Sequence, residues 1–335
     1  MRRRFVPVLA LALAALALPG ASPSAGAQQR HELRIATLAP RGSGLVRAFR
    51  KWDRMLERET DGQVGLKIYA GGVAGDEKVV IRKIRAGQLD GAAVTTTGLG
   101  MLVRKVLVLS APGLIDDYGQ LDAVRGELED DFDRMFRKEG YELLGWGDMG
   151  KTRMFSKKRI AKPSDLRSAR PWVWKDNPIM VHWLKTTGAN GVPLGVPEVY
   201  PGLQTGMIDT VLASALSSVA LQWFTKLKYV SKQSSGVVVG ALVLDKETFD
   251  ALPADARKLL RETARQGNAP LRQGARRMDA RAYRAITERG VTPVDIEPHR
   301  DAWESVAKKT RERLAGRLYP KSLLERVARI AERHR

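Results

Sequence analysis

Few residues of this 335-residue chain have the types and spacing that catalysis requires. Cysteine is absent, which excludes thiol chemistry, and no Gly-x-Ser-x-Gly, phosphate-binding loop or dinucleotide-binding fingerprint occurs. Ser305 and Lys308 match a Ser-x-x-Lys spacing, but a charged helix with a solvated face explains them more simply. The histidines are scattered without metal-ligand spacing, at His31, His182, His299 and His334. We therefore expect that the chain is not an enzyme and uses no metal or cofactor.

Tryptophan is the residue type best suited to contact a bound molecule. Trp172 and Trp174 flank Val173 in a strand-like segment, so their side chains share one face. An indole offers stacking area and one N–H donor, which suits a ring, an apolar chain or a cation. Trp146 and Trp223 come from neighbouring segments. The alternative is that these tryptophans pack between lobes, with each indole N–H bonded inside the protein.

Strand and helix patterns alternate along the chain, which is typical of parallel βαβ units. A second α/β block covers residues 151–232, and the following strand would lead back into the first block. A chain that leaves one domain, builds another and returns predicts a two-lobed α/β binding protein with a cleft between the lobes. The expected strands of the first block are 33–38, 64–69, 90–94, 143–147 and 236–244, and its expected helices are 45–59, 77–86 and 121–138.

A long helical pattern covers residues 252–289, with only Gly267 and Pro270 interrupting it. At 1.5 Å per residue such a helix would reach roughly 55 Å, enough to span both lobes. Alternatively, two helices meet near Pro270. The expected organisation is lobe I over 28–150, lobe II over 151–235, a return to lobe I with the start of the spanning helix over 236–275, and C-terminal helices on lobe II over 276–335.

The first 27 residues resemble a cleaved secretory signal. Arg2 to Arg4 form a positive region, an apolar run covers 8–18, and Ala25 and Ala27 provide the small residues of a cleavage site. The apolar run is too short for a permanent membrane span, which needs about 20 residues. We expect a periplasmic protein, cleaved near Ala27 and not embedded in the membrane.

The charge balance is strongly basic, at +20 for the whole chain and +17 without the three arginines of the signal. Such a balance can indicate nucleic acid or an anionic surface as a partner. Here the basic residues are spread along the whole length, and no nucleic-acid-binding motif accompanies them. We expect no nucleic-acid partner, while an anionic ligand or envelope surface remains an alternative to an arginine-rich composition.

The segment EVYPGLQTGMID at 198–209 carries the most specific pattern. Val199, Leu203 and Met207 form an apolar stripe on a short helix that ends near Gly206, before a buried strand. This helix–glycine–strand segment resembles the signature of solute-binding proteins of TRAP-type (tripartite ATP-independent periplasmic) transporters. Further segments resemble that family in the same order, namely LRIATLAPRGSG at 33–44, the turn at 71–77, GQLD at 87–90, GWG at 145–147 and PSDL at 163–166.

The resemblance implies a cleft between two lobes, a helix spanning both, and a set of cleft residues. It also exposes a departure. Most of the family has a ligand-binding arginine seven residues after the aspartate of PSDL, where this chain has Trp172 or, by another count, Val173. A family asparagine is also missing from the segment that ends at Ser214, which leaves Arg153 as the candidate anion anchor. The candidate ligand-binding residues are Ser43, Asp76, Thr95, Thr96, Trp146, Arg153, Trp172, Trp174 and Ser214.

We therefore expect a monomeric solute-binding subunit that captures a small organic solute by cleft closure and delivers it to the membrane permease subunits of a TRAP-type transporter. Because both carboxylate-binding hallmarks are absent, we expect simple dicarboxylates to bind weakly and the true ligand to place an aromatic, apolar or cationic portion against Trp172. The alternative is an envelope accessory protein that uses the same fold to bind a protein or a lipid-like partner.

Overall fold

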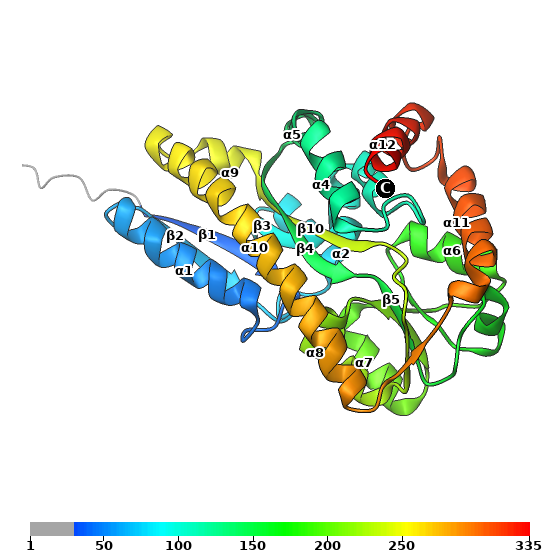
Figure 1. The fold of residues 1–335 in the computed structure, drawn as a ribbon. Helices are drawn as coiled ribbons and strands as arrows, with labels where there is room; N and C mark the ends of the chain where they lie inside the picture. Colours follow the sequence, from blue (N-terminus) through cyan, green and yellow to red (C-terminus); the bar gives the residue numbers. More distant parts are fainter. Residues whose placement is uncertain (1–29) are drawn as a thin grey trace, which may run out of the picture.

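The computed structural model describes residues 30–335, so the expected signal sequence lies outside the described residues. The chain forms two α/β lobes, and one long helix runs diagonally along both of them (Figure 1). The two-lobed α/β fold and the spanning helix expected from the sequence are confirmed. Within residues 30–335, no helix is both long and apolar enough to cross a membrane.

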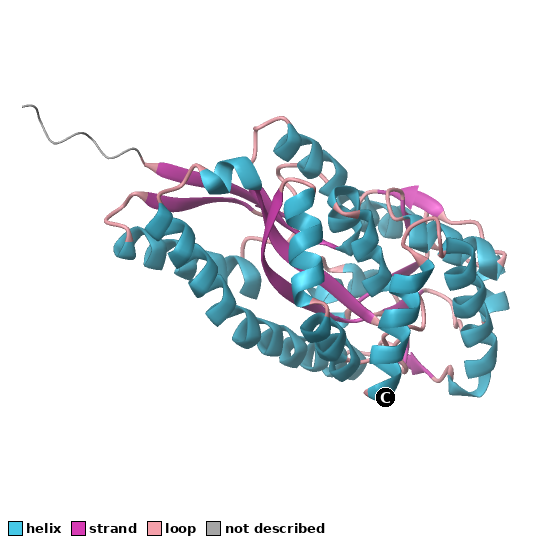
Figure 2. Cartoon of the chain, turned by 90° about the horizontal axis from the view of Figure 1, so that it is seen from above, coloured by secondary structure: helices cyan, strands magenta, loops and turns pink. Residues whose placement is uncertain are grey.

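Lobe I is built on a five-stranded sheet with the order β2-β1-β3-β10-β4. β1 runs parallel to β2 and β3, whereas β10 lies antiparallel between β3 and β4. Helices cover both faces of these long strands (Figure 2). The strands are β1 (His31–Thr37), β2 (Val64–Tyr69), β3 (Gly91–Thr95), β4 (Tyr141–Lys151) and β10 (Val237–Asp245), and the helices are α1 (Gly44–Glu59), α2 (Glu77–Arg85), α3 (Thr96–Leu102), η1 (Arg104–Ser110), α4 (Tyr118–Glu127), α5 (Glu129–Lys138) and α9 (Lys246–Asp250).

Lobe II contains a four-stranded sheet with the order β11-β9-β5-β8 and a parallel pair, β6 and β7. Its strands are short, and helices connect most of them. They are β5 (Arg153–Ser156), β6 (Trp172–Trp174), β7 (Val192–Leu194), β8 (Thr210–Ala213), β9 (Tyr229–Ser231) and β11 (Thr292–Val294), with η2 (Pro163–Ser168), α6 (Pro178–Thr187), α7 (Val196–Thr205), α8 (Ala215–Ala220), η3 (Trp223–Lys226), η4 (Glu297–His299) and α11 (Arg300–Leu314).

The helix α10 (Ala254–Glu288) is continuous over 35 residues and contains Pro270. Of the two arrangements that the sequence allowed, a single spanning helix is therefore observed. Leu260 near one end is buried in a lobe I core, and Ile286 near the other end is buried in a lobe II core. The two lobes are consequently tied together by one element in addition to the strand crossings.

Two elements differ from expectation. The single helix expected over 121–138 is two helices, α4 and α5, separated at Leu128, which leaves the helical backbone conformation with φ −115° and ψ 11° while its side chain stays buried. The last helix, α12 (Lys321–Arg333), packs on α4 of lobe I and not on lobe II. The physical reason is its apolar face, because Val327 and Ile330 complete the lobe I core.

Candidate ligand-binding site

A cavity of about 1310 Å³ lies between the lobes. Its walls come from the ends of β3, β4 and β10 and the start of α3 in lobe I, and from β6 and α8 in lobe II. It is larger than a typical small-molecule site, which measures about 300–1,000 Å³. Such a volume leaves room for a ligand and for movement of the lobes around it.

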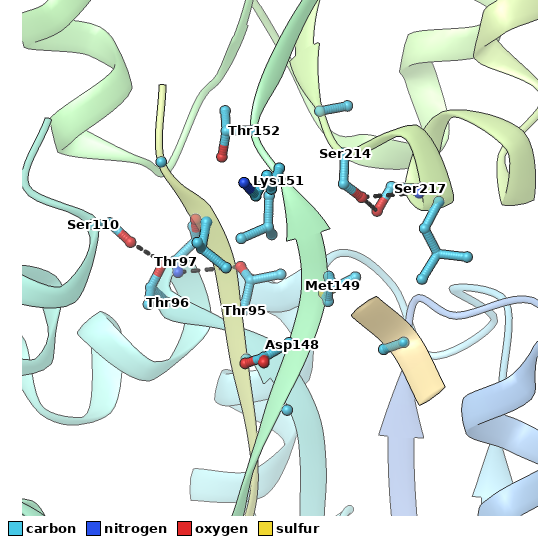
Figure 3. Close-up of a pocket in the computed structure, with 18 of the residues that line it drawn as sticks. Thr95, Thr96, Thr97, Ser110, Asp148, Met149, Lys151, Thr152, Ser214 and Ser217 are labelled. Atoms are coloured by element: carbon cyan, nitrogen blue, oxygen red, sulfur yellow. Dashed lines mark hydrogen bonds between the residues drawn. The ribbon is translucent and has the colours of Figure 1, made fainter. Parts of the chain in front are cut away.

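Hydroxyl groups from both lobes meet in the middle of this cavity (Figure 3). On the lobe I side, Thr95 caps α3, and the Thr96 hydroxyl lies 2.6 Å from that of Ser110. On the lobe II side, Ser214 caps α8 and donates to the Ser217 hydroxyl at 2.9 Å. Hydroxyls donate and accept, so this surface can meet the oxygens of a polar ligand without demanding one charge.

Lys151 projects between these two groups of hydroxyls (Figure 3). It is the last residue of β4, at the point where the chain leaves lobe I for lobe II. Within residues 30–335, no carboxylate lies close enough to Lys151 to form an ion pair, and its Nζ stands 5.6 Å from the centre of the Tyr118 ring. A half-buried ammonium group without an acidic partner favours an anion beside it.

Arg153 lines the same cavity, two residues further along the chain. Its guanidinium lies 4.1 Å over the Tyr283 ring, and Nη1 donates to the carbonyl oxygens of Ser231, at 3.1 Å, and Lys232. Nε is buried without an acceptor among the described residues, and burial lowers the pKa of the guanidinium. Arg153 is thus held in place by lobe II.

Asp76 and Glu77, neighbours at the start of α2, have different environments. Asp76 does not line the cavity, because its Oδ2 accepts from Trp174 Nε1 at 3.0 Å and from the amide of Val196 at 3.2 Å across the lobe boundary. Glu77 does line it and accepts from the amide and hydroxyl of Thr95 at 2.7 and 2.9 Å. Burial raises the pKa of Glu77 to about 7. Glu77 thereby fixes the position of the Thr95 hydroxyl.

The tryptophans form a cluster on one side of the cavity. Trp172 stacks on Trp174 with ring centres 6.0 Å apart and meets Trp223 edge-on at 5.3 Å. The Trp172 indole donates to the carbonyl of Leu194 at 3.0 Å, so neither it nor Trp174 has a free N–H group. Trp172 lines the cavity, whereas the side chain of Val173 packs into a lobe II core on the other face of β6. Towards a ligand, Trp172 can therefore offer only its ring.

Trp146 lies on the lobe I wall, where it meets Phe132 edge-on at 5.4 Å and stacks under Arg125. Asp148 lines the cavity beside Trp146 and is buried between Arg125 and Arg276, each at 2.6 Å. Because Asp148 is paired with two guanidinium groups, its charge does not oppose an anion near Lys151.

The cavity therefore brings together all the residues predicted from the sequence except Asp76, with Ser43 at its edge as the N-cap of α1. Sequence reasoning missed Lys151, Glu77, Ser110 and Ser217. A signal existed for Glu77, which stands beside Asp76 in the turn at 71–77. For Lys151, the signal was its place at the end of a strand where the chain changes lobes.

A two-lobed α/β fold with a cavity between the lobes is the architecture of an extracytoplasmic binding protein. The model of the bacterial extracellular solute-binding protein family 7 matches residues 35–315. The chain belongs to this family, as the resemblance to TRAP-type solute-binding proteins predicted, and it is a solute-binding protein.

Individual relatives agree with that assignment. The C4-dicarboxylate-binding periplasmic protein of Rhodobacter capsulatus is 22% identical over 89% of each chain. A TRAP periplasmic solute-binding protein from a Sulfitobacter species, solved with β-D-galacturonate, superposes with a TM-score of 0.82 and 20% identity over 90% of this chain and 100% of that one. A sugar-acid-binding protein from Advenella mimigardefordensis, solved with galactonate, gives a TM-score of 0.85 and 18% identity over 92% and 99%.

Proposed function

We propose that this protein captures an organic anion in the cavity between its lobes and delivers it to the membrane permease of a TRAP-type transporter. The observation that carries the proposal is Lys151, a half-buried cation without an acidic partner in the described chain, surrounded by hydroxyl groups of both lobes. The ligands named for the relatives, a C4-dicarboxylate, galacturonate and galactonate, are organic acids as well.

In this proposal Lys151 binds the anionic group of the ligand in place of the missing family arginine. Arg153 contributes a second positive charge from the lobe II side. A charge-assisted hydrogen bond contributes about 1.5–3 kcal/mol, so one well-placed ammonium accounts for roughly ten- to a hundredfold in affinity. The Ser217 hydroxyl, which accepts from Ser214 and keeps its own proton, would complete the shell of the bound carboxylate. A ligand that touches both lobes stabilises the arrangement in which they are close together, which is the basis of capture by closure.

The ring of Trp172 directs the choice among organic acids. Succinate, malate and fumarate have little apolar surface and cannot use the ring, and the Trp172 N–H group is already bonded to Leu194. We expect calorimetry to give weak or no binding for these three acids. Micromolar binding of any of them, undiminished in Trp172→Ala, would count against a role for the ring.

Lys151→Met tests the anion site, with Lys105→Met as its matched control, because Lys105 is an exposed lysine of η1 outside the cavity. A thermal-shift screen of organic acids identifies a ligand, and calorimetry then measures all three proteins. We expect a loss of about ten- to a hundredfold for Lys151→Met and no change for Lys105→Met. Equal affinity in the two variants would refute the anion site.

The cellular setting belongs to the proposal as well. We infer that the protein is a periplasmic monomer, exported with a signal cleaved near Ala27, and that the permease subunits are its partners. Intact mass of the protein from a periplasmic extract should correspond to a start near Gln28. The alternative, an envelope accessory protein with this fold, would be favoured if no small acid bound and a protein or lipid partner did.

A further inference from the structure

The cavity does not end at the cleft between the lobes, because it continues into lobe I between α1, α10 and the sheet. Leu45, Ala48 and Phe49 of α1 line it on one side, and Leu271, Gly274 and Ala275 of α10 line it on the other. We call this part the α1–α10 slot. These residues are apolar, in contrast to the hydroxyls around Lys151. The polar side chains beside them are Thr263, which accepts from Trp52, and Asn268, whose amide lies over Gly145.

The floor of the slot is formed by three neighbouring strands. Ala93 of β3 lies opposite Leu242 of β10, and Leu242 lies opposite Gly145 of β4, so the three residues stand side by side across the sheet. The outer two are small. Leu242 belongs to a strand in the interior of the sheet, yet it is only partly buried. An incompletely covered leucine on an interior strand shows that the helices above do not fill the space.

The two helices come into contact at each end of the slot. Trp52 Nε1 of α1 donates to the Thr263 hydroxyl of α10 at 2.9 Å. At the other end the helices come so close that a Cβ on Gly44 would lie 2.9 Å from Cε of Met278. Between these points there is open space beside Gly274, which is partly buried and lines the cavity, because a Cβ on it would meet no atom within 4 Å. The gap is therefore bounded, and small residues keep it open.

The slot is continuous with the anion site. Met278 is followed by Asp279, whose carboxylate accepts from the amide of Lys151 at 2.9 Å, so the slot ends beside the cation. Met278 and Met149 both line the junction. Methionine side chains are unbranched and adapt to the shape of an apolar neighbour, so they can yield to a chain passing between them.

We infer that the α1–α10 slot holds an apolar tail of the ligand, which makes the ligand class an amphipathic organic anion with its charged head at Lys151. This inference rests on the proposed function for the head group. Its physical basis is the burial of hydrocarbon, which strengthens binding roughly fourfold for each methylene removed from water. A short dicarboxylate or a sugar acid would leave the slot empty.

The test uses straight-chain monocarboxylates from acetate to decanoate, below their micelle concentrations, with calorimetry on the intact mature protein. In the unmodified protein, affinity should rise severalfold with each added methylene until the slot is filled. Gly274→Leu places a side chain in the gap and favours the helix, so the fold is retained. It should weaken decanoate binding at least tenfold and leave acetate and butanoate unchanged.

Gly126→Leu is the matched control. Gly126 is also a helical glycine whose Cβ would meet nothing within 4 Å, but it lies in α4 away from the cavity, so this variant should bind every acid normally. The inference that the slot holds an apolar tail would be wrong if affinity did not depend on chain length. It would also be wrong if Gly274→Leu weakened the binding of short and long acids equally. If short acids bind through Lys151 but length adds nothing, only this inference fails. If no acid binds at all, the proposed anion site fails with it.

Discussion

At the scale of single residues, the hydrogen bonds already made inside the protein decide which side chains can serve a ligand. The indole N–H groups of Trp172 and Trp174 donate hydrogen bonds to the Leu194 carbonyl and the Asp76 carboxylate. Lys151, in contrast, forms no ion pair with an acidic side chain of residues 30–335. The chemistry available to a ligand is therefore the cations Lys151 and Arg153, several hydroxyls and an aromatic face.

Glu77 gives a prediction about pH. Its pKa is raised by burial from 4.5 to about 7, so the folded protein holds a proton that the unfolded chain releases above pH 4.5. The free energy of unfolding should therefore decrease as the pH rises from 5 to 7, by about 2 kcal/mol from this group. Glu77→Gln cannot titrate and should lack this part of the slope.

Urea unfolding of the ligand-free protein at pH 5, 6 and 7 measures the effect. Taking the difference between the unmodified protein and Glu77→Gln removes the contribution of the histidines, which also titrate in this range. Parallel stability profiles for the two proteins would mean that Glu77 stays ionised at pH 5.

At the scale of elements, the crossing from β4 to β5 is held by α10. Oδ2 of Asp279 accepts from the Lys151 amide and Oδ1 from the Leu216 amide, each at 2.9 Å. This clamp requires glycine at position 150, where φ is +108° and a Cβ would lie 2.3 Å from Asp279 Oδ1. The position of Lys151 in the cavity thus depends on its neighbour having no side chain.

Gly150→Ala should lower the free energy of unfolding by at least about 3 kcal/mol. The backbone conformation is strained for an L-residue, and moving Asp279 away leaves two partly buried amides without acceptors. Gly126→Ala is the control and should be neutral or stabilising by up to about 1 kcal/mol, because its Cβ meets open space on a helix. The midpoints of denaturant unfolding measure the stability of the two variants. Equal midpoints would contradict the requirement for glycine at position 150.

Elements with a strong local pattern could be predicted from the sequence, and sites that depend on long-range contacts could not. The strand at 64–69 and the helix at 45–59 follow from alternation and helical periodicity. The break at Leu128 depends on packing, since a leucine gives no local stop signal. Asp76 and Glu77 differ by one position on a helix, and only the arrangement of the lobes decides which carboxylate faces the cavity.

At the scale of the whole molecule, the lobes already touch on one side of the cavity. Besides the bonds to Asp76, Asn177 Nδ2 donates to the Thr97 hydroxyl at 3.0 Å, and Lys78 pairs with Asp176 at 2.9 Å. The chain crosses between the lobes at residues 151–153 and 232–237, and α10 spans them. We expect the lobes to rotate about these crossings and these contacts to join or part with that motion.

Asp76→Ala should therefore shift the ligand-free protein towards an open form. It leaves the Trp174 and Val196 N–H groups without an acceptor unless the lobes separate and water reaches them. Small-angle scattering should give a larger radius of gyration than for the unmodified protein. Lys105→Ala changes an exposed lysine of η1 outside the cavity and should leave the profile unchanged. Identical profiles for both variants would argue for lobes held by other contacts.

The place of β10 in the lobe I sheet has a consequence for how the chain folds. β3 ends at Thr95 and β4 ends at Lys151, yet the strand that pairs with both of them begins only at Val237. The N-terminal lobe therefore stays incomplete until β5 to β9 of lobe II have been made. Pairing between segments so distant in sequence is slow. Slow completion keeps a newly made chain unfolded for longer, which is the state in which a polypeptide can be threaded through a narrow membrane channel.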